Sequence, residues 1–196
     1  LNDPTNPTLE GALEVPGWSN YIFPRGDRLI AVGRGDRGAR VAVSLYDVSR
    51  PDSPAELERV EFGEADSTSE ANADFRGIRI HDTGAWADAP MVTVPYTNNI
   101  SDGWNDSTWT WNCHPENHLQ IIDLLPDDLS LRGEIEQEGT VRRAFGMGTK
   151  VYSLSDKRLA VLDTTDRDAP YAAVTIDVGD PMAQDQCTWN SFTVDT

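Results

Sequence analysis

The sequence predicts an all-β fold built from repeated four-stranded units, and three observations support that prediction. Apolar residues alternate with period two in short runs rich in β-branched side chains, as in residues 41–48 and 118–124. No stretch of ten residues carries the apolar spacing of an amphipathic helix without a Gly or Pro in it. A turn rich in Asp and Pro recurs along the chain, which indicates a repeated supersecondary unit.

The recurring turn gives the length of the repeated unit. Its equivalent positions, at spacings of 47, 75 and 41 residues, are Pro7, Pro54, Leu129 and Pro170. Two of the spacings match the ~40–50 residues of a four-stranded β-propeller blade. The long spacing equals one blade plus an insertion of roughly 30 residues, which is typical of a loop added to one repeat. The sequence therefore predicts propeller blades made of antiparallel sheets.

The repeat also predicts the domain organisation. A β-propeller segment is expected at 1–179 and a polar C-terminal tail at 180–196. Within the segment, the expected parts are an orphan outer strand at 1–17 and blades at about 18–64, 74–139 (with a loop insertion at 98–117) and 141–179. Propellers close with ~4–8 blades. The chain is therefore expected to be the C-terminal part of a larger propeller, with the remaining blades supplied by upstream sequence or by a companion chain.

Composition and charge exclude several classes of protein. The chain has 16 Lys and Arg against 33 Asp and Glu, a net charge of −17, which argues against nucleic-acid binding because that depends on basic side chains. No apolar run approaches the ~20 residues of a membrane-spanning helix. The sequence begins at Leu1 rather than Met, which suggests a trimmed or excised piece of a longer chain.

Each unit ends its third strand on an acidic residue, namely Asp47, Asp123 and Asp163. A carboxylate just before a turn can accept hydrogen bonds from the backbone of that turn. Because the acid recurs at the same turn, we expect a structural role. A ring of ligands is the alternative.

Several segments, in order, resemble bacterial and archaeal secreted proteins with a C-terminal β-propeller domain. These segments are DPTNP (3–7), PGWSNYI (16–22), SLYDVS (44–49), STSEA (67–71) and RAF (143–145). The resemblance covers residues 1–165, with Arg76 where the family usually has Lys, and leaves the 98–117 insertion unmatched. It implies a propeller fold and an extracellular, cell-surface or periplasmic location, and it implies no particular reaction.

The 98–117 insertion holds three of the six tryptophans: Trp104, Trp109 and Trp111. Exposed indole rings stack on sugars or anchor protein partners. The alternative is a hydrophobic cluster that folds the loop over its own blade.

The same insertion contains Cys113 and His114 and ends just before His118. Thiolate and imidazole are ligands for zinc or copper, so these three residues could form a transition-metal site, with Glu116 as a fourth ligand. A disulfide between Cys113 and Cys187 is the favoured alternative, because an exported protein usually pairs its cysteines. Calcium is a further option, given the acidic composition, although no EF-hand-type loop is present.

No motif predicts a catalytic residue. His81 and Asp82 are the one neighbouring His–Asp pair, and because successive side chains of a strand point to opposite faces, they could form a relay only if they sat in a turn. The predicted function is therefore an exported, non-catalytic interaction or scaffold module that binds a protein or surface ligand. The alternatives are a metal-dependent hydrolase or oxidoreductase whose site is completed by other blades, and a glycan-binding propeller that uses the Trp-rich loop.

Overall fold

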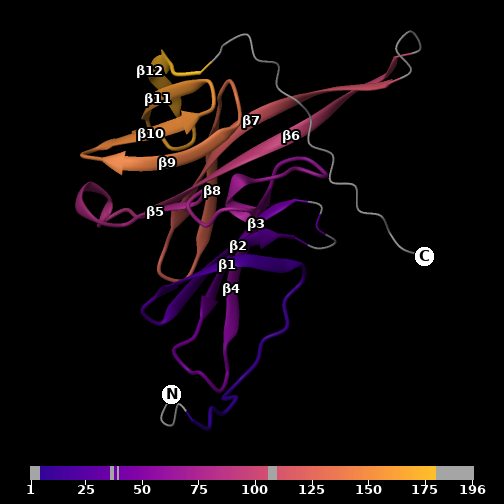
Figure 1. Ribbon diagram of the computed structural model, residues 1–196. Helices are drawn as coiled ribbons and strands as arrows, with labels where there is room; N and C mark the ends of the chain where they lie inside the picture. Colours follow the sequence, from indigo (N-terminus) through magenta and orange to yellow (C-terminus); the bar gives the residue numbers. More distant parts are fainter. Residues whose placement is uncertain (1–4, 36–37, 39, 106–109, 180–196) are drawn as a thin grey trace.

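The computed structural model describes residues 5–35, 38, 40–105 and 110–179, and for residues 104, 105 and 110–112 it describes the backbone alone. Within these residues the chain forms twelve strands in three antiparallel sheets of four strands each (Figure 1). Two 3-10 helices, η2 (Glu70–Asn72) and η3 (Gly84–Trp86), precede β6. The predicted all-β class is confirmed.

Each sheet consists of consecutive strands arranged in chain order. The first sheet is β1 (Trp18–Arg25), β2 (Arg28–Arg34), β3 (Val41–Asp47) and β4 (Ala55–Phe62). The second is β5 (Arg79–His81), β6 (Met91–Asn105), β7 (Thr110–Leu124) and β8 (Leu129–Glu136). The third is β9 (Val141–Met147), β10 (Lys150–Ser155), β11 (Arg158–Asp163) and β12 (Tyr171–Asp177). Sheets of this topology are the blades of a propeller, and each lies within one of the three ranges predicted to form a blade.

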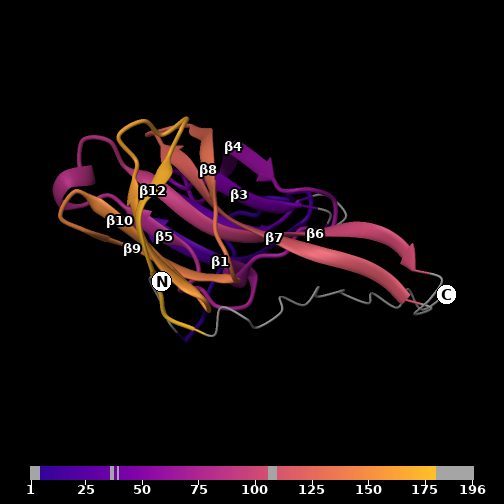
Figure 2. The ribbon, with the colours of Figure 1, turned by 90° about the horizontal axis from the view of Figure 1, so that it is seen from above.

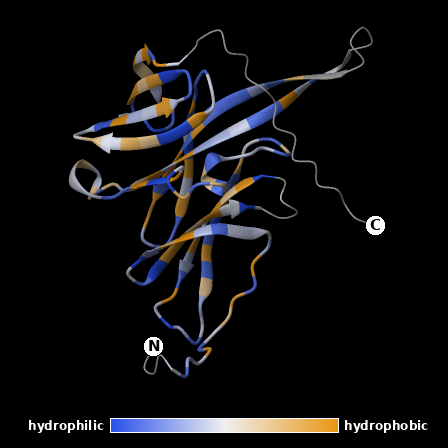
Figure 3. Cartoon of the chain, in the orientation of Figure 1, coloured by the Kyte–Doolittle hydropathy of each residue, from blue (hydrophilic) through white to orange (hydrophobic). Residues whose placement is uncertain are grey.

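The second sheet packs between the other two and buries both of its faces. Its side chains facing the first sheet, including Val92, Val94 and Ile122, form one apolar cluster with β2 and β3. Those facing the third sheet, including Met91 and Ile121, form a second cluster with β9 to β11. Neighbours such as Met91 and Val92 belong to different clusters because successive residues of a strand point to opposite faces. Figure 3 shows hydrophobic residues along the strands of all three sheets.

The outer face of the third sheet is open. Every residue of β12 is exposed, and the apolar Val174 and Ile176 are 53% and 54% exposed. At the other end of the stack, Arg59 Nη1 donates to the Pro16 carbonyl at 2.6 Å, so the segment before β1 lies against the first sheet.

Residues 5–17 form no strand, in contrast to the orphan outer strand predicted over 1–17. A strand exists only where its backbone pairs with a neighbour, and the sheet that this segment would complete is not present in the described residues. The segment nevertheless approaches the first sheet as an outer strand would. A Cβ on Gly11 would lie 2.3 Å from the Pro51 carbonyl oxygen, and one on Gly133 of β8 would lie 2.6 Å from that of Asp168.

Residues 98–117 extend a β-hairpin instead of forming an irregular loop. β6 and β7 are 15 residues each, and their register runs from Met91↔Asp123 to Asn105↔Thr110. β5 pairs only with residues 91–93 of β6, and β8 pairs with residues 118–124 of β7. The far half of the hairpin therefore projects from the blades as a two-stranded ribbon (Figures 1 and 2).

Candidate functional site

The pre-turn aspartates have the structural role expected for them in two of the three sheets. Asp47 Oδ1 accepts from the Ser49 backbone N–H at 2.8 Å, and Asp163 Oδ1 accepts from that of Thr165 at 3.0 Å. These backbone hydrogen bonds are the main reason that the pKa of both carboxyl groups is lowered. Asp123 differs, because its carboxylate faces the third sheet and binds Arg167.

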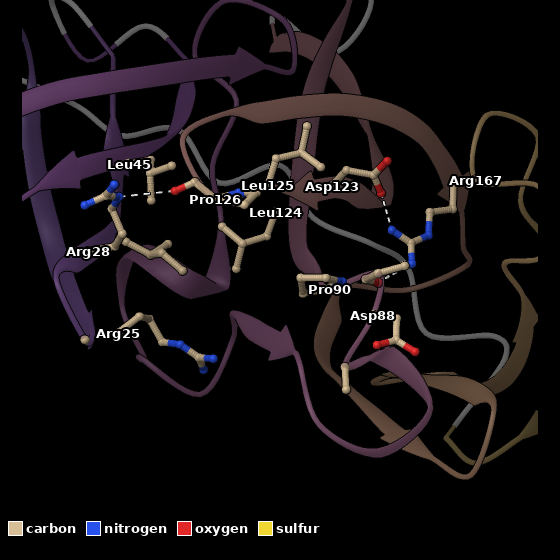
Figure 4. Close-up of a pocket in the computed structure, with 14 residues that line it drawn as sticks. Arg25, Arg28, Leu45, Asp88, Pro90, Asp123, Leu124, Leu125, Pro126 and Arg167 are labelled. Atoms are coloured by element: carbon tan, nitrogen blue, oxygen red, sulfur yellow. Dashed lines mark hydrogen bonds and ion pairs between the residues drawn. The ribbon is translucent and has the colours of Figure 1, made fainter.

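A pocket of about 610 Å³ lies between the first two sheets (Figure 4). Its apolar lining includes Ile30 and Leu45 from the first sheet and Leu124 at the end of β7. The charged groups at its edges are Arg25, Arg28, Asp88, Asp123 and Arg167. This combination of an apolar lining and a few polar groups is typical of small-molecule binding sites.

The two arginines that bridge the sheets at this pocket, Arg28 and Arg167, are already paired. Arg28 bridges the first two sheets, because Nη1 lies 2.9 Å from Asp47 Oδ1 and Nε donates to the Pro126 carbonyl at 3.2 Å. Arg167 reaches back from the turn before β12, where it binds the Asp123 carboxylate and donates to the Ala89 carbonyl at 2.6 Å. These arginines thus hold adjacent sheets together.

Sequence reasoning missed this pocket and its two bridging arginines. Arg28 and Pro126 are 98 positions apart, so no local motif joins them. The repeat was the one signal in the sequence that could have pointed to this pocket. Arg167 lies in one copy of the recurring Asp/Pro turn, and Leu124 lies just before another copy.

The neighbouring residues His81 and Asp82 have separate partners, and β5 ends at His81, so Asp82 lies just beyond the strand. The buried His81 ring lies 3.0 Å from Thr93 Oγ1 and packs against the ring of Trp86 at 5.2 Å. Asp82 forms an ion pair with Arg25. Burial is the main cause that lowers the pKa of His81 to about 4, with Arg79 and Arg167 adding to it.

The structure places the three proposed metal ligands on β7 but on different faces of that strand. Cys113 lies opposite Ser101 and His114 opposite Ile100, so by strand alternation Cys113 faces away from His114. His114 Nδ1 lies 2.8 Å from Asp102 Oδ1, and this hydrogen bond is the main reason that the pKa of His114 is raised. Its Nε2 lies 3.7 Å from Glu116 Oε1.

His118 lies closer to the blade than His114 and is largely buried. Its ring stacks on Tyr96 with a centroid distance of 4.9 Å, and Nδ1 lies 3.5 Å from Glu134 Oε1. Across the described ranges, no group of three or more His, Cys, Asp and Glu side chains is arranged to hold a metal ion. The transition-metal and calcium sites remain predictions.

The other predicted binding residues are at the far end of the hairpin. The register places Trp104 of β6 directly opposite Trp111 of β7, while Trp109 lies outside the described residues. The described residues contain no free cysteine. Cys187 lies outside the described residues, so its pairing with Cys113 remains a prediction.

Comparison with known proteins adds the family. The family model of the beta propeller domain matches residues 1–167. An uncharacterized protein of Methanocaldococcus jannaschii is 37% identical over 164 residues, which cover 83% of this chain and 22% of that protein. An uncharacterized protein of Archaeoglobus fulgidus is 39% identical over 59 residues, which cover 30% of this chain and 9% of that protein.

The chain thus spans less than a quarter of the length of either relative. None of the helices that the structure describes is long and apolar enough to cross a membrane. The four-stranded sheets, their order and the family match over residues 1–167 agree, and the chain belongs to the beta propeller domain family.

Proposed function

We propose that this chain is an exported, non-catalytic interaction module that binds a protein through the β6–β7 hairpin. The observation that carries the proposal is the extent of that hairpin, whose strands continue far past the residues that pair with β5 and β8. Three polar residues that the sequence analysis weighed as ligands or as part of a relay have structural roles, which supports a non-catalytic module. Asp47 and Asp163 hold turns, and His81 is packed inside the fold.

The projecting ribbon has the features of a recognition element. A two-stranded ribbon is only marginally stable by itself, and its free edges present backbone N–H and C=O groups with which an extended partner segment can pair. The opposed Trp104 and Trp111 positions share one face of the ribbon. Tryptophan is enriched among the residues that dominate binding energy at protein interfaces.

The register of the tryptophans also favours glycan binding as a second candidate. Two indole rings on one face of a ribbon could form a platform for a sugar ring, which would make the module a glycan-binding propeller. Binding of oligosaccharides, followed by Trp fluorescence, separates this function from protein recognition.

The test compares the intact chain with one whose hairpin is shortened. Replacing residues 99–115 by Asn-Gly leaves Asn98 and Glu116 flanking a two-residue hairpin turn and removes the ribbon while retaining the blades. A photo-crosslinking residue is placed at Ser101 on the ribbon and, as the control position, at the exposed Thr175 of β12. Cross-linking is done on the envelope surface of the source cells.

We expect one protein adduct of defined mass from position 101 and none of that mass from position 175. Added intact chain should compete the adduct away, and added shortened chain should not. Equal competition by the shortened chain would contradict the proposal. Saturable binding of an oligosaccharide with Trp quenching, together with no protein adduct, would favour the glycan-binding alternative.

A further inference from the structure

The first strands of the three sheets line a second hollow, which is separate from the hairpin. This hollow, about 650 Å³ in volume, is lined by residues of β1, β5 and β9 and of the links before and after β5. The three strands lie near one another in Figures 1 and 2. In a propeller the equivalent strand of each blade faces the central channel, which is where many propellers have open space. The volume falls within the ~300–1,000 Å³ of small-molecule sites.

The charge of this hollow is opposite to that of the whole molecule. Four of the chain's 16 basic residues line it, namely Arg25, Arg76, Arg79 and Arg143, with Asp82 as the one acidic residue of the lining. The rest of the chain is strongly acidic, with a net charge of −17. A local excess of guanidinium groups inside an acidic protein focuses anions at that place.

The arginines are only partly neutralised by neighbouring carboxylates. Arg25 pairs with Asp82, while Arg76 and Arg143 share Asp74, at 3.0 Å from Arg76 Nε and 3.6 Å from Arg143 Nη2. The exposed Arg79 has no carboxylate partner among the described residues. Two carboxylates therefore face four guanidinium groups, which leaves two positive charges for a ligand.

Aromatic rings stand beside the arginines. Phe75 and Phe145 are 53% and 40% exposed, and both line the hollow. The guanidinium carbon of Arg76 lies 5.6 Å from the centroid of the Phe75 ring, and Phe145 stacks on Tyr152 at 5.2 Å. Exposed rings next to arginines suit a ligand that has both a flat apolar body and an anionic group.

We infer that this hollow binds a small organic anion, with its carboxylate or phosphate group on Arg79 and Arg143 and its flat apolar body against Phe75 and Phe145. Guanidinium groups bind both kinds of anion with paired, charge-assisted hydrogen bonds. The site uses none of the hairpin residues, so it stands or fails independently of the proposed hairpin function.

The test titrates the purified full chain with phenyl phosphate, and separately with inorganic phosphate and with phenol, by calorimetry and amide-resolved NMR. We expect phenyl phosphate to bind at least tenfold more tightly than either fragment. The changes in amide chemical shift caused by phenyl phosphate should be largest in residues 75–83 and 143–145. Arg79→Gln combined with Arg143→Gln should weaken binding at least tenfold, and raising the salt concentration should also weaken it. Arg50→Gln, which removes one charge from an exposed turn, is the matched control and should change affinity less than twofold.

Four results would overturn the inference. One is equal affinity for inorganic and phenyl phosphate, which would remove the role of the rings. Another is binding that the double variant retains, and the third is shift changes that map elsewhere, such as to the ribbon. Circular dichroism checks that the double variant, which alters two exposed side chains, keeps its fold. Phe145→Ala gives a second test that changes no charge, and it should also weaken phenyl phosphate binding at least tenfold. Binding of an acidic peptide without binding of phenyl phosphate would also contradict the small-ligand assignment.

Discussion

Burial of His81 couples the stability of this fold to pH. His81 is 3% exposed and lies between Thr93 and Trp86, where protonation would place a charge away from water. Its pKa of about 4 in the folded protein lies below the value of about 6.5 for an unfolded chain. The unfolded state therefore takes up the proton first. The stabilisation is fully present above pH 6.5 and is lost as the pH falls toward 4.

We predict that the free energy of unfolding falls by about 1–2 kcal/mol between pH 7 and pH 5 because of this residue. The measurement is urea denaturation at both pH values, above the range in which most carboxyl groups titrate. His81→Gln, which has no titratable group, should lose most of the difference. The prediction is wrong if wild type and variant weaken equally over this range.

At the scale of elements, neighbouring blades meet through a close approach of backbone to backbone. Gly133 of β8 donates its N–H to the Arg167 carbonyl at 2.8 Å, and its Cα faces the turn that precedes β12. A Cβ there would lie 2.5 Å from Pro170 Cδ and 2.6 Å from the Asp168 carbonyl oxygen. Because these atoms belong to a rigid turn, they cannot move away cheaply.

We therefore expect Gly133→Ala to destabilise the fold by roughly 1–3 kcal/mol, the usual cost of overpacking, as measured by urea unfolding. Gly11→Ala is the matched comparison, since Gly11 makes the equivalent approach to Pro51 from a segment with no strand pairing. It should leave global stability nearly unchanged and should increase proteolytic cleavage within residues 5–17. Equal unfolding midpoints for wild type and Gly133→Ala would contradict the prediction.

The repeat explains how much of these elements the sequence could predict. Gly11 lies four residues after Pro7, and Gly133 lies four residues after Leu129, its equivalent in the repeat. The spacing that predicted the blades therefore also predicted that these two glycines are equivalent. The site was less predictable because its residues come from different blades. Arg28 reaches Pro126 from 98 positions away, and the hollow that contains Arg79 exists only once three first strands are brought together. The metal prediction treated residues 98–117 as a loop, whereas a strand separates Cys113 and His114 onto opposite faces.

At the scale of the whole molecule, three blades leave an apolar face without cover. The second sheet is buried on both faces, but the exposed Val174 and Ile176 of β12 have no sheet beyond them among the described residues. The approach of Gly11 to the first sheet repeats that of an outer strand from a preceding blade. We propose that further blades complete the propeller on both sides, either from additional sequence of the same protein or from a companion chain.

We predict that the 21.6 kDa chain associates with copies of itself when it is purified alone. The uncovered face of the third sheet is apolar, and its outer strand β12 has a free edge within the described ranges. Native mass spectrometry without reductant should show species heavier than one chain, each chain lighter by two hydrogens if Cys113 and Cys187 are joined. Val174→Thr combined with Ile176→Thr should shift the spectrum toward the monomer, because it makes the open face polar while keeping β-branched residues in the strand. A wild-type chain that remains monomeric over the micromolar range, with the same unfolding midpoint as the double variant, would show that the β12 face needs no partner. That result would leave a three-bladed segment as the complete folding unit.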